Sequence, residues 1–381
     1  MIRMNRSFGP FCRVLLLLLA AALFPAGAEA HAAASSAGRA EDTAAQEIAE
    51  EEPDVKRIVL GHVGDSYEWH IATAGGREWS LPLPVIVHSP SSGWHCFSAK
   101  RLRGGAEYEG LRIAADGDHA GKIVERQADG SDLRPLDLSI TKTVAGLLLN
   151  SALVVALVLG AARRYRGRKP DAAAPRGVVG LFETLVESLV DDLIEPCVGP
   201  SYRRFAPYLL TVFCFIFLNN LMGLIPFFPG GANVTGNIAV ALVLAVATFL
   251  VVNLSGSRHY WKDIFWPDVP TWLKVPVPII PLIELVGVFT KPFALMIRLF
   301  ANMLAGHAVI LSLTCVVFVT VKMGAAVNAS MTALSVLFSI FMNCLELLVA
   351  FLQAYVFTML SAVFIGLAQE RGGEADAGAE K

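Results

Sequence analysis

Three long apolar stretches dominate the chain from residue 143 onward. Residues 143–162 and 205–257 carry no charged side chain, and residues 275–369 carry only five. About 20 apolar residues cross the hydrocarbon core of a bilayer, so the first stretch fits one span and the second fits two. The third fits two long helices, at roughly 282–321 and 327–368, which must tilt, bend or project beyond the bilayer. The pattern predicts an all-α polytopic membrane protein with five membrane-crossing helices.

Turn-forming residues divide these stretches. Residues 229–233 read Pro-Gly-Gly-Ala-Asn and should form the turn inside the second stretch,. Gly324 to Asn328 should separate the last two helices,. Three prolines are expected to interrupt the chain before the fourth span, namely Pro276, Pro278 and Pro281,.

An amphipathic segment lies between the first and second spans. Leucines recur every four residues from Leu181 to Leu193, and glutamates and aspartates lie between them. This spacing predicts a helix over Val178 to Glu195 that ends at Pro196. Because its polar face is acidic, we expect it to pack on protein at the cytoplasmic surface and not on anionic lipid.

The N-terminus has the organisation of an export signal. A basic start is followed by an apolar run from Val14 to Phe24 and by the small-residue pattern Ala28-Glu29-Ala30. These features predict a cleaved signal peptide at residues 1–30, with an uncleaved membrane anchor as the alternative. Either one places the following residues outside the cytoplasm.

Residues 31–140 read as a polar extracytoplasmic extension, in which acidic residues outnumber basic ones. Its first part, residues 32–52, is rich in alanine and glutamate and is expected to be disordered. Tyr67 to Ile71 and Leu81 to His88 contain strand-forming residues, so a small β-rich extension is predicted. The spacing of its histidines and of Cys96 matches no metal-ligand template, so no metal site is expected.

Charged residues beside the spans predict the topology. A cluster of basic residues from Arg163 to Arg176 follows the first span and marks the cytoplasmic side of the membrane,. The mature N-terminus should therefore lie outside a bacterial inner membrane, and the tail at 371–381 should be cytoplasmic. The predicted domains are a signal peptide (1–30), an extension (31–140), a membrane domain (141–370) and this tail.

Composition narrows the class of protein further. Of 381 residues, 55% are hydrophobic and 17% charged, with a net charge of −2 and a mean hydropathy of +0.56. Soluble domains average about 45–50% apolar and about 25% charged residues, so a simple cytosolic enzyme is excluded. Basic residues form no groove-sized patch, which excludes a nucleic-acid binder. The six cysteines contain no CxxC pattern and predict neither a disulfide framework nor a zinc site,.

Charges inside the last two spans are the candidates for function. Glu284, Lys291 and Arg298 are spaced by seven residues and share one stripe of a helix, which Asn302 continues,. An arginine at the bilayer centre costs from about 2.5–3.5 to about 10–17 kcal/mol, so it faces a partner or a water-filled cavity. No acid lies one turn away from Arg298, and its partner must come from elsewhere. For Glu284 and Lys291, a structural ion pair remains an equal interpretation.

A second set of polar residues is distributed over both of the last two helices. On the final helix Asn343, Glu346 and Gln353 gather on one side,. His307 lies on the preceding helix and could pair with Glu346. Such a pair is either a hydrogen-bonded strut or part of a proton relay, because imidazole groups titrate near neutral pH and intramembrane ionisable groups mark proton paths.

These segments resemble a known family. Residues 291–307, KPFALMIRLFANMLAGH, closely resemble the signature helix of subunit a of the rotary F-type ATP synthase membrane sector. Residues 352–357, LQAYVF, and 219–226, NNLMGLIP, resemble two further segments of that family. The resemblance covers about residues 141–370 and leaves the extension without a role.

The resemblance implies a function and a set of partners. Two long tilted C-terminal helices would face a ring of c subunits, and further partners would be the b-subunit peripheral stalk, other ATP synthase subunits and the lipid bilayer. The chain would translocate protons without a cofactor. It would hold no catalytic ATP site, and the phosphate-loop pattern GxxxxGK[ST] is absent from its sequence,.

The resemblance also assigns roles to single residues. Arg298 would be the essential arginine that governs deprotonation of the c-ring carboxylates, with Asn302 beside it and Gln353 facing it. Glu284 would belong to the cytoplasmic half-channel. His307 and Glu346 would form the external half-channel. Some family members carry the acid on the first of these two helices and the histidine on the second, and the exchange seen here predicts that the two side chains touch.

Two other functions would account for some of these residues. A secondary transporter could bind its substrate on Arg298 and Glu346, but such proteins usually contain paired repeats, and none is visible in this sequence. A non-transporting assembly scaffold would leave Arg298 without a purpose.

Overall fold

The computed structural model describes residues 65–74, 77–114, 119–127, 131–166, 177–225, 230–266, 279–320 and 324–369. The expected signal peptide, the segment at 32–52 and the tail at 371–381 lie outside these residues. The chain divides into two compact units. The first includes residues 144–303 and 347–369, and the second includes the extension up to residue 143 together with residues 304–346.

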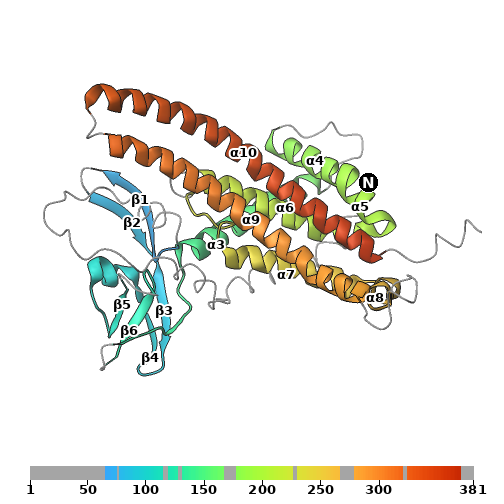
Figure 1. Cartoon of the computed structure of the whole chain (residues 1–381), viewed down its shortest axis with the longest axis horizontal. Coiled ribbons are helices and arrows are strands. Elements are labelled where there is room, and N and C mark those ends of the chain that lie inside the picture. Colours follow the sequence, from blue (N-terminus) through green and yellow to red (C-terminus); the bar gives the residue numbers. More distant parts are fainter. Residues whose placement is uncertain are drawn as a thin grey trace, which may run out of the picture. The chain divides into compact units, whose positions relative to one another are not determined.

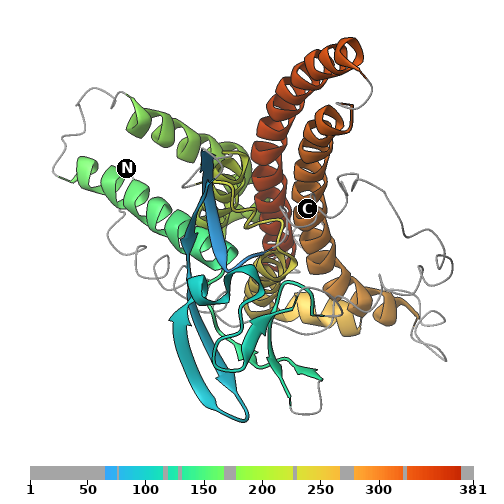
Figure 2. The same cartoon turned by 90° about the vertical axis from the view of Figure 1, so that its left-hand side faces the viewer.

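Apolar helices build the first unit. They are α3 (Lys142–Tyr165), α6 (Tyr202–Leu224), α7 (Ile238–Ser255), the first part of α9 (Ile279–Val319) and the second part of α10 (Ala325–Gln369) (Figure 1). Among the described residues, five helices are long and apolar enough to cross a membrane. The predicted all-α polytopic membrane fold is confirmed, and the observed bounds of the last two helices differ from the expected ones by only a few residues. Figure 2 shows that α10, in red, curves along its length.

The helix before α6 is longer than predicted. α4 (Val178–Ser188) continues through a π-helical turn, η2 (Leu189–Ile194), into α5 (Glu195–Val198). The expectation that this helix ends at Pro196 is wrong, because Pro196 lies in the first turn of α5, where a missing backbone N–H is tolerated,. The chain turns at Gly199, whose φ of 74° favours glycine, and η3 (Gly199–Ser201) leads into α6,.

One further helix boundary and one additional helix differ from the sequence prediction. Pro281 does not precede the fourth long helix but lies in the first turn of α9, where it leaves the helix intact,. A short helix, α8 (Arg258–Phe265), follows α7 and was not expected. Its N-terminus is capped by Ser257, whose hydroxyl accepts a hydrogen bond from the amide of Tyr260,.

Strands dominate the extension, as predicted for a small β-rich region. In chain order they are β1 (Glu68–Ala74), β2 (Arg77–Pro82), β3 (Pro84–Ser89), β4 (Gly93–Ser98), β5 (Leu111–Ile113), β6 (Ile123–Arg126), β7 (Asp132–Leu133) and β8 (Leu136–Asp137). They pair antiparallel in the orders β1-β2, β4-β3-β8 and β5-β6-β7. The predicted run at 81–88 is divided, since β2 ends at Pro82 and β3 begins at Pro84.

A hydrophobic cluster holds these short strands together. Alternate residues of β3 point inward, so that Val85 and Val87 are buried against Phe97 of β4,. A 3-10 helix, η1 (Ala99–Gly105), adds Leu102 to this cluster, and β6 adds Ile123. The remaining members are Tyr67, Ala99 and Leu111, with Tyr108 and Ile113 packed against them.

Candidate functional site

The polar stripe of α9 faces away from the packed interior of the first unit. Glu284, Lys291 and Arg298 are all exposed in the isolated chain. Leu295 and Leu299, on another side of the same helix, are 2% and 0% exposed. Seven-residue spacing therefore places the three charged side chains on the unpacked side, as the helical period predicts.

Arg298 has no partner among the described residues. No hydrogen bond or ion pair joins its guanidinium to any of them. A guanidinium in hydrocarbon needs a counter-ion or water, since its desolvation is otherwise strongly unfavourable. The geometry therefore leaves room for an acidic group that this part of the chain does not supply.

The amide side chains next to this arginine bond each other. Asn302 lies four residues after Arg298 on α9, and its Nδ2 donates to Oε1 of Gln353 on α10 at 2.8 Å. Gln353 is buried, between Ala350 and Ala354, which are fully buried. In the described residues the hydrogen bond of Gln353 is thus with Asn302 and not with Arg298.

His307 and Glu346 meet in the second unit, as the exchanged residue types predicted. Nδ1 of His307 lies 2.8 Å from Oε1 of Glu346. Glu346 is only 5% exposed, and its Oε2 is buried without a hydrogen-bond partner among the described residues. A buried carboxylate oxygen of this kind is a natural site for a proton or a water molecule. The role of the pair stays a prediction.

A glycine makes room for this carboxylate. A Cβ atom on Gly306 would lie 2.6 Å from Oε1 of Glu346, which is closer than real side chains come. A larger residue at position 306 would therefore make the Glu346 carboxylate, the end of a flexible side chain, shift from its observed position. Our reasoning from the sequence missed Gly306, although a small residue directly before the paired histidine was the available signal.

Glu284 and Lys291 do not pair with each other in the described residues. Lys291 places its Nζ 5.6 Å from the ring centroid of Phe364. It also borders a cavity of about 20 Å³, enough for one water molecule, together with Asn253 and Tyr260,. Burial, and to a smaller extent the charge of Glu284, raise the pKa of the Tyr260 phenol. The structural ion pair considered for Glu284 and Lys291 is therefore not observed.

The α6 segment that resembles the family holds buried amides. Nδ2 of Asn150 on α3 donates to Oδ1 of Asn219 at 2.9 Å. Asn220 donates to the carbonyl of Ala350 on α10 at 3.3 Å and accepts from the hydroxyl of Thr235 at 2.6 Å. These bonds fix α6 against α3 and α10. The sequence resemblance flagged the segment but did not reveal its contacts.

Comparison with known proteins identifies the family. The family model described as ATP synthase A chain matches residues 147–366, which contain every predicted site residue. ATP synthase subunit a of Chlorobium phaeobacteroides (strain DSM 266) is 45% identical over 245 residues, covering 63% of this chain and 68% of that protein. ATP synthase subunit a 2 of Chlorobaculum tepidum is 46% identical over 241 residues, with 61% and 64% covered.

The extension is also shared with other proteins. ATP synthase subunit a of Anaeromyxobacter dehalogenans is 34% identical over 333 residues, covering 82% of this chain and 80% of that protein. A separate family model, a domain of unknown function called DUF8433, matches residues 58–138. The ATP synthase A chain model, in contrast, spans most of the membrane domain, and the chain therefore belongs to the ATP synthase A chain family.

Proposed function

We propose that this chain is the proton-translocating, non-catalytic subunit of a bacterial F-type ATP synthase. It spans the membrane several times, and its last two long helices provide the residues along which protons enter and leave. The supporting observation is that Arg298 is exposed on α9 and has no counter-ion among the described residues. An acid on another subunit would supply that counter-ion.

The proposed partner acid is the carboxyl group of a c subunit in a rotating ring. Burial in hydrocarbon keeps such a group protonated, and a nearby guanidinium favours its ionised form, typically by about 1–3 pKa units. The proton is then released into one aqueous half-channel. A fixed positive charge between the two half-channels also repels a hopping proton and prevents leakage. The driving force is about 2.3 kcal/mol per charge for each 100 mV.

We assign the remaining polar residues to the two access paths. His307 and Glu346 carry protons in the external half-channel, where the unpartnered Oε2 of Glu346 can accept one. Glu284 belongs to the cytoplasmic half-channel. Asn302 and Gln353 hold α9 and α10 at a fixed distance beside Arg298.

The proposal includes an orientation and partners. Exposed apolar side chains flank Arg298, including Phe293 and Ile297, and form a surface that a c ring could cover. The b-subunit peripheral stalk and other ATP synthase subunits are further partners. The basic residues at the end of α3 support a cytoplasmic position for that end. This orientation implies that the mature N-terminus lies outside the cytoplasm. The proposal keeps the domain boundaries at residues 30, 140 and 370.

Replacement of the arginine tests the proposal. The Arg298→Ala variant of the assembled complex would be reconstituted in vesicles, and ATP-driven acidification would be followed with a pH-sensitive dye. We expect pumping to fall to background. The matched control is Arg163→Ala, an exposed arginine at the end of α3, which should retain pumping. Pumping at the wild-type rate by Arg298→Ala would refute the assignment, as would a purified complex without a c ring.

A further inference from the structure

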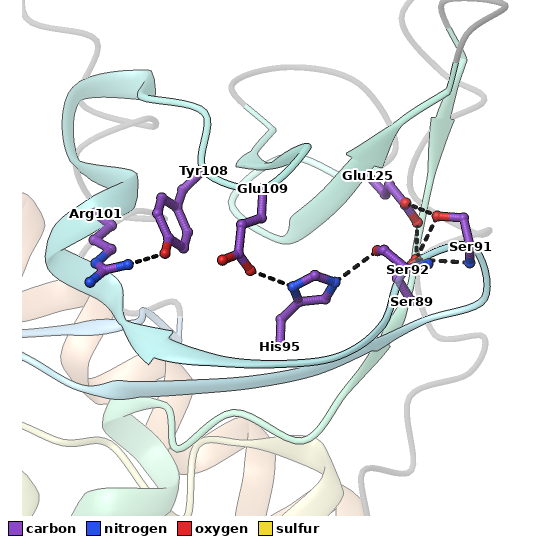
Figure 3. A network of polar contacts seen from close by, with 8 residues as sticks. All are labelled: Ser89, Ser91, Ser92, His95, Arg101, Tyr108, Glu109 and Glu125. Carbon is purple, nitrogen blue, oxygen red and sulfur yellow. Dashed lines mark hydrogen bonds and ion pairs between the residues drawn. The ribbon is translucent and has the colours of Figure 1, made fainter.

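Three polar side chains of the extension form a continuous hydrogen-bonded chain (Figure 3). Oγ of Ser92 lies 2.7 Å from Nε2 of His95, and Nδ1 of the same imidazole lies 2.5 Å from Oε2 of Glu109. A hydroxyl, an imidazole and a carboxylate thus bond in sequence, through the two different ring nitrogens. This arrangement is the recurring one for an activated serine nucleophile, its base and the group that orients the base.

The fold determines where each of the three residues lies. Ser92 is the last residue of the short turn between β3 and β4, and His95 follows on β4, where it pairs with Val87. Glu109 precedes β5. Its φ of 54° is the only positive value of a non-glycine residue among the described residues. Such backbone strain concentrates at functional sites and persists only where the surroundings hold it.

Other polar contacts fix the turn that carries Ser92. The hydroxyl of Ser89 accepts hydrogen bonds from the amides of Ser91 and Ser92, at 3.0 and 3.2 Å. Ser89 in turn donates to Oε2 of Glu125 at 2.5 Å, and Ser91 donates to the other carboxylate oxygen. Glu125 is only 8% exposed. The backbone of the nucleophile is therefore tied to a buried carboxylate.

Neighbouring side chains also hold Glu109, the carboxylate of this hydrogen-bonded series. Tyr108, the neighbour of Glu109, packs its ring against Phe97 with 5.0 Å between centroids and accepts a hydrogen bond from Arg101. The hydrogen bond with His95 lowers the pKa of Glu109, followed by a smaller effect of Tyr108, which keeps the carboxyl group ionised. An ionised Glu109 favours the tautomer with the proton on Nδ1, leaving Nε2 free to accept from Ser92.

The site is accessible on the nucleophile side. Ser92 is exposed, whereas the His95 side chain is only 11% exposed. The solvent-facing hydroxyl and the covered base match the division of roles that nucleophilic catalysis requires.

We propose that Ser92, His95 and Glu109 form a second, hydrolytic site that acts on small activated carboxylic esters. Ser92 Oγ forms a bond to the acyl carbon, and its proton moves to Nε2 of His95. The bond between the acyl carbon and the alkoxy oxygen then breaks, and the leaving alcohol takes that proton. Water attacks the acyl-serine and gives a proton to His95, which returns it to Ser92 as the carboxylic acid departs.

The expected rate of ester hydrolysis at this site is modest. The amides of Ser91 and Ser92 already donate to Ser89, so neither is available to stabilise an oxyanion. Acceleration then rests on general-base catalysis, which contributes typically about 10²–10⁴-fold. This limit is the reason why the substrate class is activated esters and not amides.

Covalent labelling of the full-length chain tests the site. The purified chain would be treated with a fluorophosphonate probe, and the modified residue would be located by mass spectrometry of the peptide that contains β3 and β4. We expect Ser92 to be modified, and modification to fall about tenfold or more in His95→Asn. The control Ser98→Ala removes a different exposed serine, at the end of β4, and should leave labelling of Ser92 unchanged. Hydrolysis of p-nitrophenyl acetate should fall about tenfold or more in Ser92→Ala.

The wild-type experiment alone can overturn the proposal, whatever the folding of the variants. Absence of modification at Ser92, under conditions that fully modify a known serine hydrolase, would overturn it. Equal modification of wild type and His95→Asn would also overturn it, because Ser92 would then be merely an exposed hydroxyl. Neither result bears on the proposed proton translocation, which uses other residues.

Discussion

Nδ1 of His307 and Oε1 of Glu346 lie 2.8 Å apart, although 39 positions separate the two residues in the sequence. The contact joins α9 to α10 and leaves the second carboxylate oxygen buried without a partner among the described residues. A strut would be satisfied by one hydrogen bond, whereas a relay needs a further acceptor. The unpartnered oxygen therefore favours a proton-transfer role.

Exchange of the two residues tests this role. We expect His307→Ala and Glu346→Ala each to lower ATP-driven proton pumping by about tenfold or more, since proton transfer by a positioned side chain contributes about 10²–10⁴-fold. The double variant His307→Glu with Glu346→His keeps the pair and should recover part of the rate. Pumping is measured with a pH-sensitive dye in vesicles. Single variants that pump at the wild-type rate would reduce the pair to a structural contact.

Gly306 offers a second test of the same geometry. A Cβ in Gly306→Ala would come within 2.6 Å of Oε1 of Glu346, so this carboxylate must shift, and the shift should disturb its contact with His307. We expect pumping to fall while the complex still assembles. The matched control is Gly287→Ala on the same helix, where a Cβ meets no atom within 4 Å. Equal pumping by the two variants would contradict a required position for Glu346.

The sequence alone predicted the features that depend on composition and on helical periodicity. Uncharged stretches located the helices, and the spacing of Arg298 and Glu284 placed them on one side of α9. The short helix α8 escaped prediction, because eight residues of mixed polarity have no distinctive pattern,. Pro196 was misjudged, because its effect depends on where a helical segment restarts. Contacts such as that between His95 and Glu109 arise only when segments that are separated in the sequence meet in the fold.

The bond between Asn302 and Gln353 should contribute measurably to the stability of the helix pair. Interhelical hydrogen bonds in membrane proteins average about 0.6 kcal/mol and reach about 1.7 kcal/mol. A double-mutant cycle with Asn302→Ala and Gln353→Ala would measure the coupling by unfolding of the chain in a denaturing detergent. We expect a coupling within this range. A coupling of zero would mean that the 2.8 Å contact stabilises nothing.

The extension should lose stability in acid through Glu125. Hydrogen bonds from Ser89 and then Ser91 lower the pKa of this carboxyl group. A lowered pKa stabilises the fold above the ordinary value, about 4.3 for glutamate, and this stabilisation is lost as the pH falls through the lowered value. Hydrogen bonds to charged groups contribute about 1.5–3 kcal/mol. Glu125→Gln should therefore be less stable than wild type at neutral pH, and the difference should shrink in acid.

Hydrogen–deuterium exchange of the β6 peptide in the full chain measures this difference. Rates are corrected for the intrinsic effect of pH on amide exchange. The control is Glu107→Gln, which removes the charge of an exposed glutamate of the same extension and should leave protection unchanged. The comparison runs from neutral pH to a pH of about 3, well below the ordinary carboxyl pKa. If the amide protection of Glu125→Gln and of wild type fell in parallel over this range, the charge of Glu125 would not hold the turn. The negative charge of Glu125 would then add nothing to the hydrogen bonds that Ser89 and Ser91 donate to this side chain.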